Sequence, residues 1–270
     1  MTKVIVAGAA GRMGQRLVHA VRTYPGLELA AAFEAPGNPA IGKDVGVLCG
    51  EGETGIRIEE GLESVIGRGE VLIDFTFHTA TVQFARLAAQ HGLAMVIGTT
   101  GLEAAELQEV KDLAERHFPC VQSPNMAVGV NVLFKLVEKA AKALGDAYDV
   151  EIVEAHHRMK KDAPSGTALK LGQVAAAALN RDLDQVGVME RCGMIGARTD
   201  REIGIQTVRG GDIVGDHTVY FAGIGERLEI VHRATSRDNF ALGAARAASW
   251  VRRQANGMYT MFDVLDLADL

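Results

Sequence analysis

The amino terminus joins a short hydrophobic run to a cluster of glycines, and this combination strongly restricts the possible folds. Residues 3–7 (Lys-Val-Ile-Val-Ala) are rich in β-branched residues, which is typical of a buried parallel strand. Residues 8–14 (GAAGRMG) follow at once, and a helical pattern of apolar residues follows them. A strand, a glycine turn and a helix in this order open a doubly wound α/β sheet that binds a dinucleotide. The spacing is GxxGxxG rather than GxGxxG, so the match is imperfect.

Glycines in such a turn let backbone N–H groups approach a pyrophosphate at the N-terminus of the helix. A second strand, 27–33, ends in Glu34, which lies 20 residues after Gly14 (34 − 14). An acid at this position can accept hydrogen bonds from the adenosine ribose hydroxyls. A plain tight turn is the alternative, but the strand and the acid together favour nucleotide binding. We therefore predict cofactor contacts from Gly8, Ala9, Ala10, Gly11, Arg12, Met13 and Glu34.

Strand and helix patterns alternate up to about residue 126. Apolar strands are expected at 71–75, 94–97 and 119–122, with helical patterns between them. This βαβ alternation predicts a parallel sheet, and ligands of such sheets bind at the carboxyl ends of the strands. Residues just after these strands therefore extend the predicted crevice beyond the glycine turn; for 98–101, a simple turn is the alternative. They are Thr76, Gly98, Thr99, Thr100, Ser123, Pro124, Asn125 and Met126.

The character of the chain changes after Gly145-Asp146. A strand at 149–154 and a helix at about 166–179 are followed by three strands between 203 and 233. Gly223-Ile-Gly225 separates the last two strands and predicts a hairpin turn. These elements predict a second α+β domain with a mixed or antiparallel sheet, whose uncovered faces or edges favour self-association.

A helix from Asn239 and an apolar tail at 261–267 can return to the first domain. We therefore expect a dinucleotide-binding domain formed by residues 1–126 with 237–270. Residues 127–236 are expected to form a substrate-binding and oligomerisation domain. The glycine-rich loop at 210–215 fits either a mobile lid or a plain connector.

Residues 154–169 (EAHHRMKKDAPSGTAL) are the most informative segment of the second domain. Two adjacent histidines are followed by three cations, and Ser165-Gly166-Thr167 then opens a helical pattern. The free N–H groups at that helix start, with the helix dipole, would form an anion site. The segment therefore predicts a place where a small acidic molecule is bound and protonated. A solvated basic loop in front of a capped helix is the alternative.

Composition excludes several classes of protein. The net charge of −6 over 270 residues argues against a nucleic-acid binder, which needs clustered Lys and Arg. Three widely spaced cysteines without a CxxC pair indicate a reducing compartment and no metal site. No apolar run approaches the roughly 20 residues that span a membrane. A cytoplasmic enzyme without membrane or nucleic-acid partners is the expectation.

Together these motifs resemble the dihydrodipicolinate reductase family of bacterial lysine biosynthesis. Residues 154–169 carry the strongest match, supported by 11–14 (GRMG), by Asn125 with 128–131 (VGVN) and by 263–267 (DVLDL). The resemblance implies that NADH or NADPH reduces 4-hydroxy-tetrahydrodipicolinate, or its dehydrated form, to tetrahydrodipicolinate in lysine and diaminopimelate biosynthesis. It also implies a Rossmann domain, a homotetramer and no metal.

By the same resemblance, His156 and Lys160 donate the proton. His157 and the triplet Ser165, Gly166 and Thr167 bind the substrate carboxylates. The chemistry of the residues agrees, because a histidine titrates near neutral pH and a dicarboxylate needs cationic or helix-terminus anchors. Of the two adjacent histidines only one is expected to face the substrate, and we expect it to be His156.

Two positions depart from the family pattern. Ala35 follows Glu34 where many relatives carry an arginine that can meet a 2′-phosphate, so we predict a preference for NADH, with NADPH usable through Arg12 or Lys43. Phe77-His78 replaces a common Arg-Pro pair, and an ordinary loop histidine is the favoured interpretation of His78. Two other functions compete: an amino-acid dehydrogenase on the same fold, and a dinucleotide-sensing regulator without catalysis.

Overall fold

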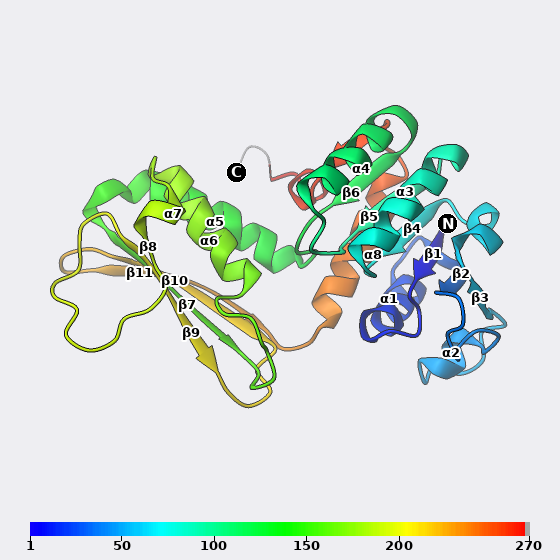
Figure 1. Cartoon of the computed structure of the whole chain (residues 1–270), viewed down its shortest axis with the longest axis horizontal. Helices are drawn as coiled ribbons and strands as arrows, with labels where there is room; N and C mark the ends of the chain where they lie inside the picture. Colours follow the sequence, from blue (N-terminus) through cyan, green and yellow to red (C-terminus); the bar gives the residue numbers. More distant parts are fainter. Residues whose placement is uncertain (268–270) are drawn as a thin grey trace. The chain divides into compact units, whose positions relative to one another are not determined.

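The computed structural model describes residues 1–267 and contains two compact units (Figure 1). Among the described residues, the first unit consists of Met1–Val128 and 237–267, and the second consists of Gly129–Ser236. The chain therefore passes between the units twice. None of the helices in residues 1–267 has the length and apolar character needed to cross a membrane.

The first unit is built on a seven-stranded sheet in which all neighbouring strands are parallel. From β1 the chain first adds strands on one side and then, from β4 onward, on the other. The order reverses between β1 and β4, which is where doubly wound sheets bind ligands. The order is β12 (Gly257–Tyr259), β6 (Pro119–Gln122), β5 (Ala94–Ile97), β4 (Val71–Asp74), β1 (Thr2–Ala7), β2 (Leu27–Glu34) and β3 (Ile58–Glu60).

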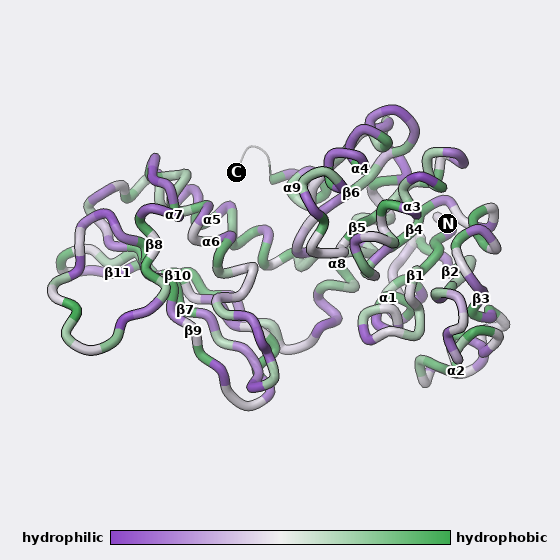
Figure 2. Tube along the Cα trace, in the orientation of Figure 1, coloured by the Kyte–Doolittle hydropathy of each residue, from purple (hydrophilic) through white to green (hydrophobic). Residues whose placement is uncertain are grey.

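Helices cover both faces of this sheet (Figure 1). In β1, Val4 and Val6 pack with α1 (Arg12–Thr23) and α8 (Asp238–Val251), whereas Ile5 packs on the side of α3 (His78–His91) and α4 (Ala104–His117). Because both faces are buried, the central strands are continuously hydrophobic, as Figure 2 shows. The predicted α/β fold is confirmed. Shorter helical elements are α2 (Val45–Leu48), α9 (Met261–Val264), η1 (Leu62–Ser64) and η2 (Ile66–Arg68).

Helix α8 packs unusually close to the end of the β6 loop. A Cβ atom on Gly243 would lie 1.8 Å from the carbonyl oxygen of Met126, so the two backbones touch at this glycine. Strand β12 then pairs with β6, and α9 contacts both α8 and β12. The C-terminal segment thus completes the edge of the sheet that the first part of the chain begins.

The second unit contains a five-stranded mixed sheet. Its order is β11 (Arg227–Ala234), β10 (Gly215–Ala222), β7 (Asp149–His156), β9 (Ile203–Arg209) and β8 (Gly187–Val188). Strands β11, β10 and β7 run antiparallel, while β7, β9 and β8 run parallel. The expected hairpin joins β10 to β11, and α6 (Gly166–Ala178) contacts β7 and β9. Other helices are α5 (Val128–Leu144), α7 (Leu183–Val186) and η3 (Gly145–Ala147).

The two faces of this sheet differ in exposure. Residues such as Ile152 of β7 and Val219 of β10 are fully buried on the face that α6 contacts. On the opposite face, Val208 is 46% exposed and Val231 42% exposed. The loop between β8 and β9 adds a hydrophobic stretch (Figure 2) at Met194–Ile195, where both side chains are exposed.

Candidate active site

The glycine turn after β1 leaves the N-terminus of α1 open. Gly8 has a φ of 61°, in the left-handed region that glycine adopts without strain. A Cβ atom on Gly14 would lie 2.0 Å from the Gly8 carbonyl oxygen, so only glycine lets α1 approach the turn this closely. Gly11 precedes the 12-residue helix without forming a side-chain cap. The first N–H groups of α1 therefore suit an anion such as a pyrophosphate.

Glu34 at the end of β2 is tied to the same turn. Its Oε1 accepts a hydrogen bond of 2.8 Å from the N–H of Ala10, while Oε2 accepts a longer one of 3.3 Å from Ala35. Oε2 is therefore the oxygen that can best accept from a ribose hydroxyl. Glu34 lines a pocket of about 580 Å³, together with Gly8, Ala10, Gly11, Asn38, Pro39, Ala40, Lys43, Leu48, Phe75 and Thr76.

Asp74 at the end of β4 anchors the floor of this region, a role that the sequence did not suggest. It is 0% exposed and accepts hydrogen bonds from the N–H and hydroxyl of Thr76, at 2.9 and 2.6 Å, and from the hydroxyl of Thr81. The N–H of Thr76 also contacts the Thr99 hydroxyl at 3.0 Å. Burial raises the pKa of Asp74, although these hydrogen bonds oppose the rise. The Asp74 carboxyl group therefore fixes the loop after β4, and the Thr99 hydroxyl joins that loop to the one after β5.

The loops after β5 and β6 support the pocket from within the first unit. A Cβ atom on Gly98 would overlap the Phe75 ring at 2.2 Å, so this glycine makes room for a ring that lines the pocket. The N–H of Ser123 donates to Ile97, and its hydroxyl donates to the carbonyl of Asn125 at 2.9 Å. These contacts join the ends of β5 and β6.

The predicted cofactor residues occupy different positions relative to the pocket. Gly8, Ala10, Gly11 and Glu34 line it directly. Buried or partly buried side chains that do not line the pocket belong to Ala9, Met13, Thr99, Ser123, Asn125 and Met126. Gly98 supports it as described, whereas Arg12, Thr100 and Pro124 are exposed. His78 forms hydrogen bonds with Glu106 of α4 at 2.8 and 2.9 Å, so it contributes to the packing of two helices.

In the second unit, His156 ends β7 beside a buried carboxylate. Its Nδ1 lies 2.7 Å from Oε2 of Glu154, which is 0% exposed. Arg209 of β9 forms a two-pronged contact with both oxygens of Glu154, at 2.7 and 2.8 Å. Burial opposes ionisation, but the hydrogen bonds from His156 and Arg209 outweigh it and hold the pKa of Glu154 well below its usual range. The carboxylate is therefore ionised and orients the imidazole.

The N-terminus of α6 is organised by Ser165, which is 3% exposed. The Ser165 hydroxyl accepts from the N–H of Ala168 and lies 3.1 Å from Nε2 of His217. The Ser165 N–H donates to Glu154 at 2.9 Å. Burial, followed by the nearby His156, lowers the pKa of His217 to about 4, so this ring is neutral near pH 7. Ser165 thus has both its polar groups engaged, while Gly166 next to it is exposed.

The remaining predicted residues lie in the loop between β7 and α6. Lys160 pairs with Asp162 at 2.8 Å, with 21% of its side chain exposed, and its N–H donates to the carbonyl of His157. The glycine-rich loop lies alongside, since Gly210 donates to His156 and Arg158 donates to Gly211. Thr167 follows Gly166 in the first turn of α6 and is partly buried.

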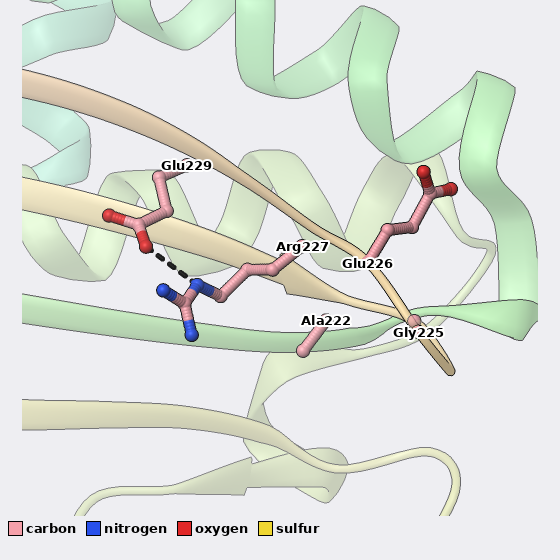
Figure 3. Close-up of a pocket in the computed structure, with 6 residues that line it drawn as sticks. Ala222, Gly225, Glu226, Arg227 and Glu229 are labelled. Carbon is pink, nitrogen blue, oxygen red and sulfur yellow. Dashed lines mark hydrogen bonds and ion pairs between the residues drawn. The ribbon is translucent and has the colours of Figure 1, made fainter.

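A separate hollow lies at the hairpin between β10 and β11 (Figure 3). Arg227 and Glu229 form an ion pair of 2.6 Å there, shown as a dashed line. Glu226 points away from this pair and bonds with Tyr148. The hollow contains a neutralised pair and none of the predicted site residues. Within residues 1–267, no group of three or more His, Cys, Asp or Glu side chains is arranged to hold a metal.

Comparison with known proteins adds a decisive observation. Two family models match consecutive parts of the chain: dihydrodipicolinate reductase, N-terminus, over residues 2–126, and dihydrodipicolinate reductase, C-terminus, over 129–265. The chain belongs to the dihydrodipicolinate reductase family. It is 66% identical to a 4-hydroxy-tetrahydrodipicolinate reductase of Desulfotalea psychrophila, over 100% of both chains. It is 55% identical to that of Syntrophobacter fumaroxidans, over 99% of this chain and 100% of the relative.

Solved structures agree with this family membership. A dipicolinate-bound dihydrodipicolinate reductase from Paenisporosarcina sp. TG-14 has a TM-score of 0.78 and 27% identity, over 97% of this chain and 98% of that chain. An amine dehydrogenase from Mycobacterium smegmatis shares the fold, with a TM-score of 0.59 at 12% identity over 96% of this chain and 95% of its own.

Family membership confirms the resemblance that the sequence motifs carried. The chain is an NAD(P)H-dependent oxidoreductase of lysine and diaminopimelate biosynthesis, with a pyridine nucleotide as cofactor and a small dicarboxylate as the family's substrate. The amino-acid dehydrogenase and the non-catalytic regulator are thereby excluded. The sequence did not predict a role for four of these residues, namely Glu154, Arg209, His217 and Asp74. Of the four, only Glu154 lies inside the motif of residues 154–169.

Proposed function

We propose that this chain reduces 4-hydroxy-tetrahydrodipicolinate, or its dehydrated form, to tetrahydrodipicolinate, with the proton supplied by His156 and Lys160. Buried Glu154 lies between His156 and the N-terminus of α6 and forms a hydrogen bond with each, and this arrangement carries the proposal. It combines a proton donor with an anion site in one unit, as reduction of an imine dicarboxylate requires.

The dinucleotide-binding domain is proposed as residues 1–126 with 237–270, of which 268–270 lie outside the described residues; it corresponds to the first unit. The residues fit an NAD(P)H molecule: the start of α1 suits the pyrophosphate, and Glu34 suits a ribose diol in a pocket of about 580 Å³. When bound, the reduced nicotinamide supplies the hydride. The other predicted cofactor residues are proposed to shape the loops around it.

The second unit, proposed as residues 127–236, binds the dicarboxylate. Gly166 and Thr167 offer the N–H groups of the first turn of α6 to one carboxylate, and His157 is proposed to contact the substrate. Ser165 acts indirectly, because its N–H and hydroxyl are already engaged with Glu154, Ala168 and His217. This assignment refines the direct role that the motif suggested for Ser165.

The 4-hydroxyl group leaves as water, which gives the conjugated imine. Hydride addition to this imine leaves an electron pair on a neighbouring carbon or nitrogen, and one proton must neutralise it. With Nδ1 of His156 committed to Glu154, protonated His156 delivers that proton from Nε2 and becomes the neutral Nδ1–H form. Lys160, only 21% exposed, is the second cation of the same loop and supports proton delivery.

The test is the loss of NADH absorbance with the condensation product of pyruvate and aspartate semialdehyde as substrate. We expect turnover by the wild type, and a fall in kcat of about 10²- to 10⁴-fold in His156→Ala and in Lys160→Ala. Exposed His91 and Lys170 provide matched controls, since His91→Ala and Lys170→Ala remove the same groups elsewhere. Wild-type turnover that survives both site substitutions would reject the assignment of proton donors.

We further propose a preference for NADH. Glu34 places a carboxylate at the ribose and Ala35 supplies no cation, although exposed Lys43 lines the same pocket and leaves NADPH usable. Arg12 is the other cation that was predicted to bind the 2′-phosphate of NADPH. The ratio of kcat/KM for the two cofactors measures the preference. A value at least tenfold better for NADPH would contradict it.

A homotetramer is proposed because the second unit leaves one sheet face half-exposed. Val208 and Val231 on that face, and Met194–Ile195 in the neighbouring loop, are hydrophobic surface that a second copy would cover. Sedimentation should give a mass four times 28.7 kDa. Monomers at micromolar concentration would refute the assembly. The three cysteines are all free, which supports the proposed cytoplasmic location.

A further inference from the structure

Glu154 is an unusual residue for the middle of a sheet, because its carboxylate is completely buried. Five hydrogen bonds converge on its two oxygens. Arg209 gives two, and His156, Thr207 and the N–H of Ser165 give one each. Two carboxylate oxygens accept about four hydrogen bonds. The group is therefore saturated, and all its acceptor capacity is directed to fixed partners.

One oxygen fixes the proton donor. Oε2 of Glu154 lies 2.7 Å from Nδ1 of His156, so a donor proton must sit on Nδ1. The remaining ring nitrogen, Nε2, faces Gly215, where an added Cβ atom would lie 3.0 Å away. Gly215 keeps Nε2 uncovered on that side. The carboxylate thus sets both the orientation of the ring and the nitrogen that can release a proton.

The other oxygen fixes the anion site. Oε1 of Glu154 accepts the N–H of Ser165 at 2.9 Å, which holds the residue that begins α6. The hydroxyl of Ser165 caps the N–H of Ala168 and meets Nε2 of His217, which is 4% exposed. Exposed Gly166 follows directly as the first residue of α6. The helix terminus and the imidazole therefore share one anchor.

We propose that Glu154, clamped by Arg209, is a positioning residue that fixes the proton-donating imidazole and the carboxylate-binding end of α6 relative to each other. The inference deepens the proposed function and rests on it for its kinetic readouts. It adds a specific consequence: one substitution should impair proton delivery and substrate binding together, although Glu154 itself touches neither substrate nor cofactor.

A merely structural role would have different consequences. A buried ion pair that only supports the fold would change thermal stability and leave the pH dependence of kcat unchanged. The charged and titratable groups facing His156 are Glu154 of β7, Arg209 of β9, His217 of β10 and Lys160 of the following loop. Glu154 is the only anion among these four. Its neutralisation should therefore destabilise the protonated imidazole.

The test variant is Glu154→Gln, which keeps the shape and removes the charge. We expect kcat to fall about 100-fold, the alkaline limb of its pH profile to move to lower pH, and KM for the dicarboxylate to rise several-fold. NADH binding should stay within twofold of wild type, because the nucleotide pocket belongs to the other unit. Asp146→Asn is the matched control, since it neutralises a carboxylate paired with buried Arg181 in the same unit. Asp146→Asn should keep wild-type kcat and pH profile.

Each outcome decides the inference. A Glu154→Gln enzyme with the kcat and pH profile of wild type overturns it. A Glu154→Gln enzyme with a lower Tm but with unchanged kcat and pH profile overturns it too. Arg209→Lys keeps the charge but not the two-pronged contact. Its kcat should therefore lie between those of wild type and Glu154→Gln. Wild-type protein without turnover, in contrast, would reject the proposed function.

A second measurement needs no variant that folds poorly. Long-range ¹H–¹⁵N NMR of histidine-labelled wild type reports the tautomer of each ring, with His156 assigned from the signal lost in His156→Ala. Neutral His156 should carry its proton on Nδ1. A proton on Nε2 of the neutral ring would overturn the inference, whether or not the enzyme turns over.

Discussion

Gly14 offers a quantitative test of how the glycine turn is built. In Gly14→Ala, the new Cβ atom would lie 2.0 Å from the Gly8 oxygen and 2.7 Å from Cα of Ala9. Non-bonded carbon and oxygen atoms stay about 3.3 Å apart. Either α1 or the turn must therefore move by roughly 1 Å, because both neighbours are backbone atoms that cannot rotate away. Either movement separates the turn from the first N–H groups of α1, which together would hold the pyrophosphate.

The magnitude follows from two opposing terms. Alanine favours a helix by about 1 kcal/mol over glycine. Overpacking costs about 1–3 kcal/mol in a buried site, and a clash with backbone belongs at the upper end. The net destabilisation should be about 1–2 kcal/mol, or a fall in Tm of about 2–8 °C. Loss of one charge-assisted hydrogen bond to the cofactor should weaken NADH binding by about 10- to 100-fold.

Gly172→Ala is the matched control. Gly172 also lies buried inside a helix, but its Cβ atom would meet only the ends of flexible side chains, Ile205 and Leu183, at 2.9–3.1 Å. These side chains can adjust, so the helix propensity of alanine should offset the crowding. Thermal melts and fluorescence titration with NADH measure both variants. A Gly14→Ala protein with the Tm of wild type and a Kd for NADH within twofold of wild type would refute the packing argument.

Three further outcomes are expected. Ala35→Arg should shift the NADPH-to-NADH ratio of kcat/KM upward about tenfold, because a cation beside Glu34 can meet a 2′-phosphate; an unchanged ratio would place the ribose elsewhere. Desolvation raises the pKa of the Asp44 carboxyl group, but hydrogen bonds from Thr54 and Val47 outweigh this effect and lower the pKa to about 2. Its stabilising effect is present above about pH 3.9 and lost as pH falls toward 2, so Asp44→Asn should flatten the pH dependence of the urea midpoint there. Gly215→Ala should lower kcat several-fold with NADH binding unchanged, because its Cβ atom would crowd His156; unaltered kcat would show that Nε2 has room.

Much of the fold was predictable because buried parallel strands form continuous apolar runs and helices repeat their apolar residues with the helical period. The strands β5 and β6 have the bounds that their apolar runs predicted, and the hairpin after β10 was indicated by its glycines. Strands β3 and β12 were missed. Each has three residues, too few to display a period, and each is fixed only by pairing with a strand distant in sequence.

In the second unit, the candidate site could be recognised from the sequence only where its residues are neighbours along the chain. His156, Lys160 and the start of α6 lie within one segment, so their chemistry could be recognised together. Arg209 and His217 are 55 and 52 residues from their partners, Glu154 and Ser165. The positions of Arg209 and His217 depend on how β9 and β10 align with β7. Glu154 pairs with Thr207 of β9 on one side and with His217 of β10 on the other. No local pattern encodes that register.

The network around Glu154 also shows where stability and activity are expected to conflict. Burying a carboxylate and an arginine carries a desolvation penalty, and apolar residues of similar volume are often as stable or more stable by about 1–4 kcal/mol. Replacing the pair, as in Glu154→Met with Arg209→Met, should therefore fold at least as stably as Glu154→Gln alone, which leaves Arg209 without its carboxylate. The double variant should nevertheless lack activity, because nothing would orient His156 or hold the N–H of Ser165. If the double variant is active, the pair is replaceable and its persistence needs another reason. If it is inactive and stable, the pair is retained for the chemistry it arranges rather than for the fold it supports.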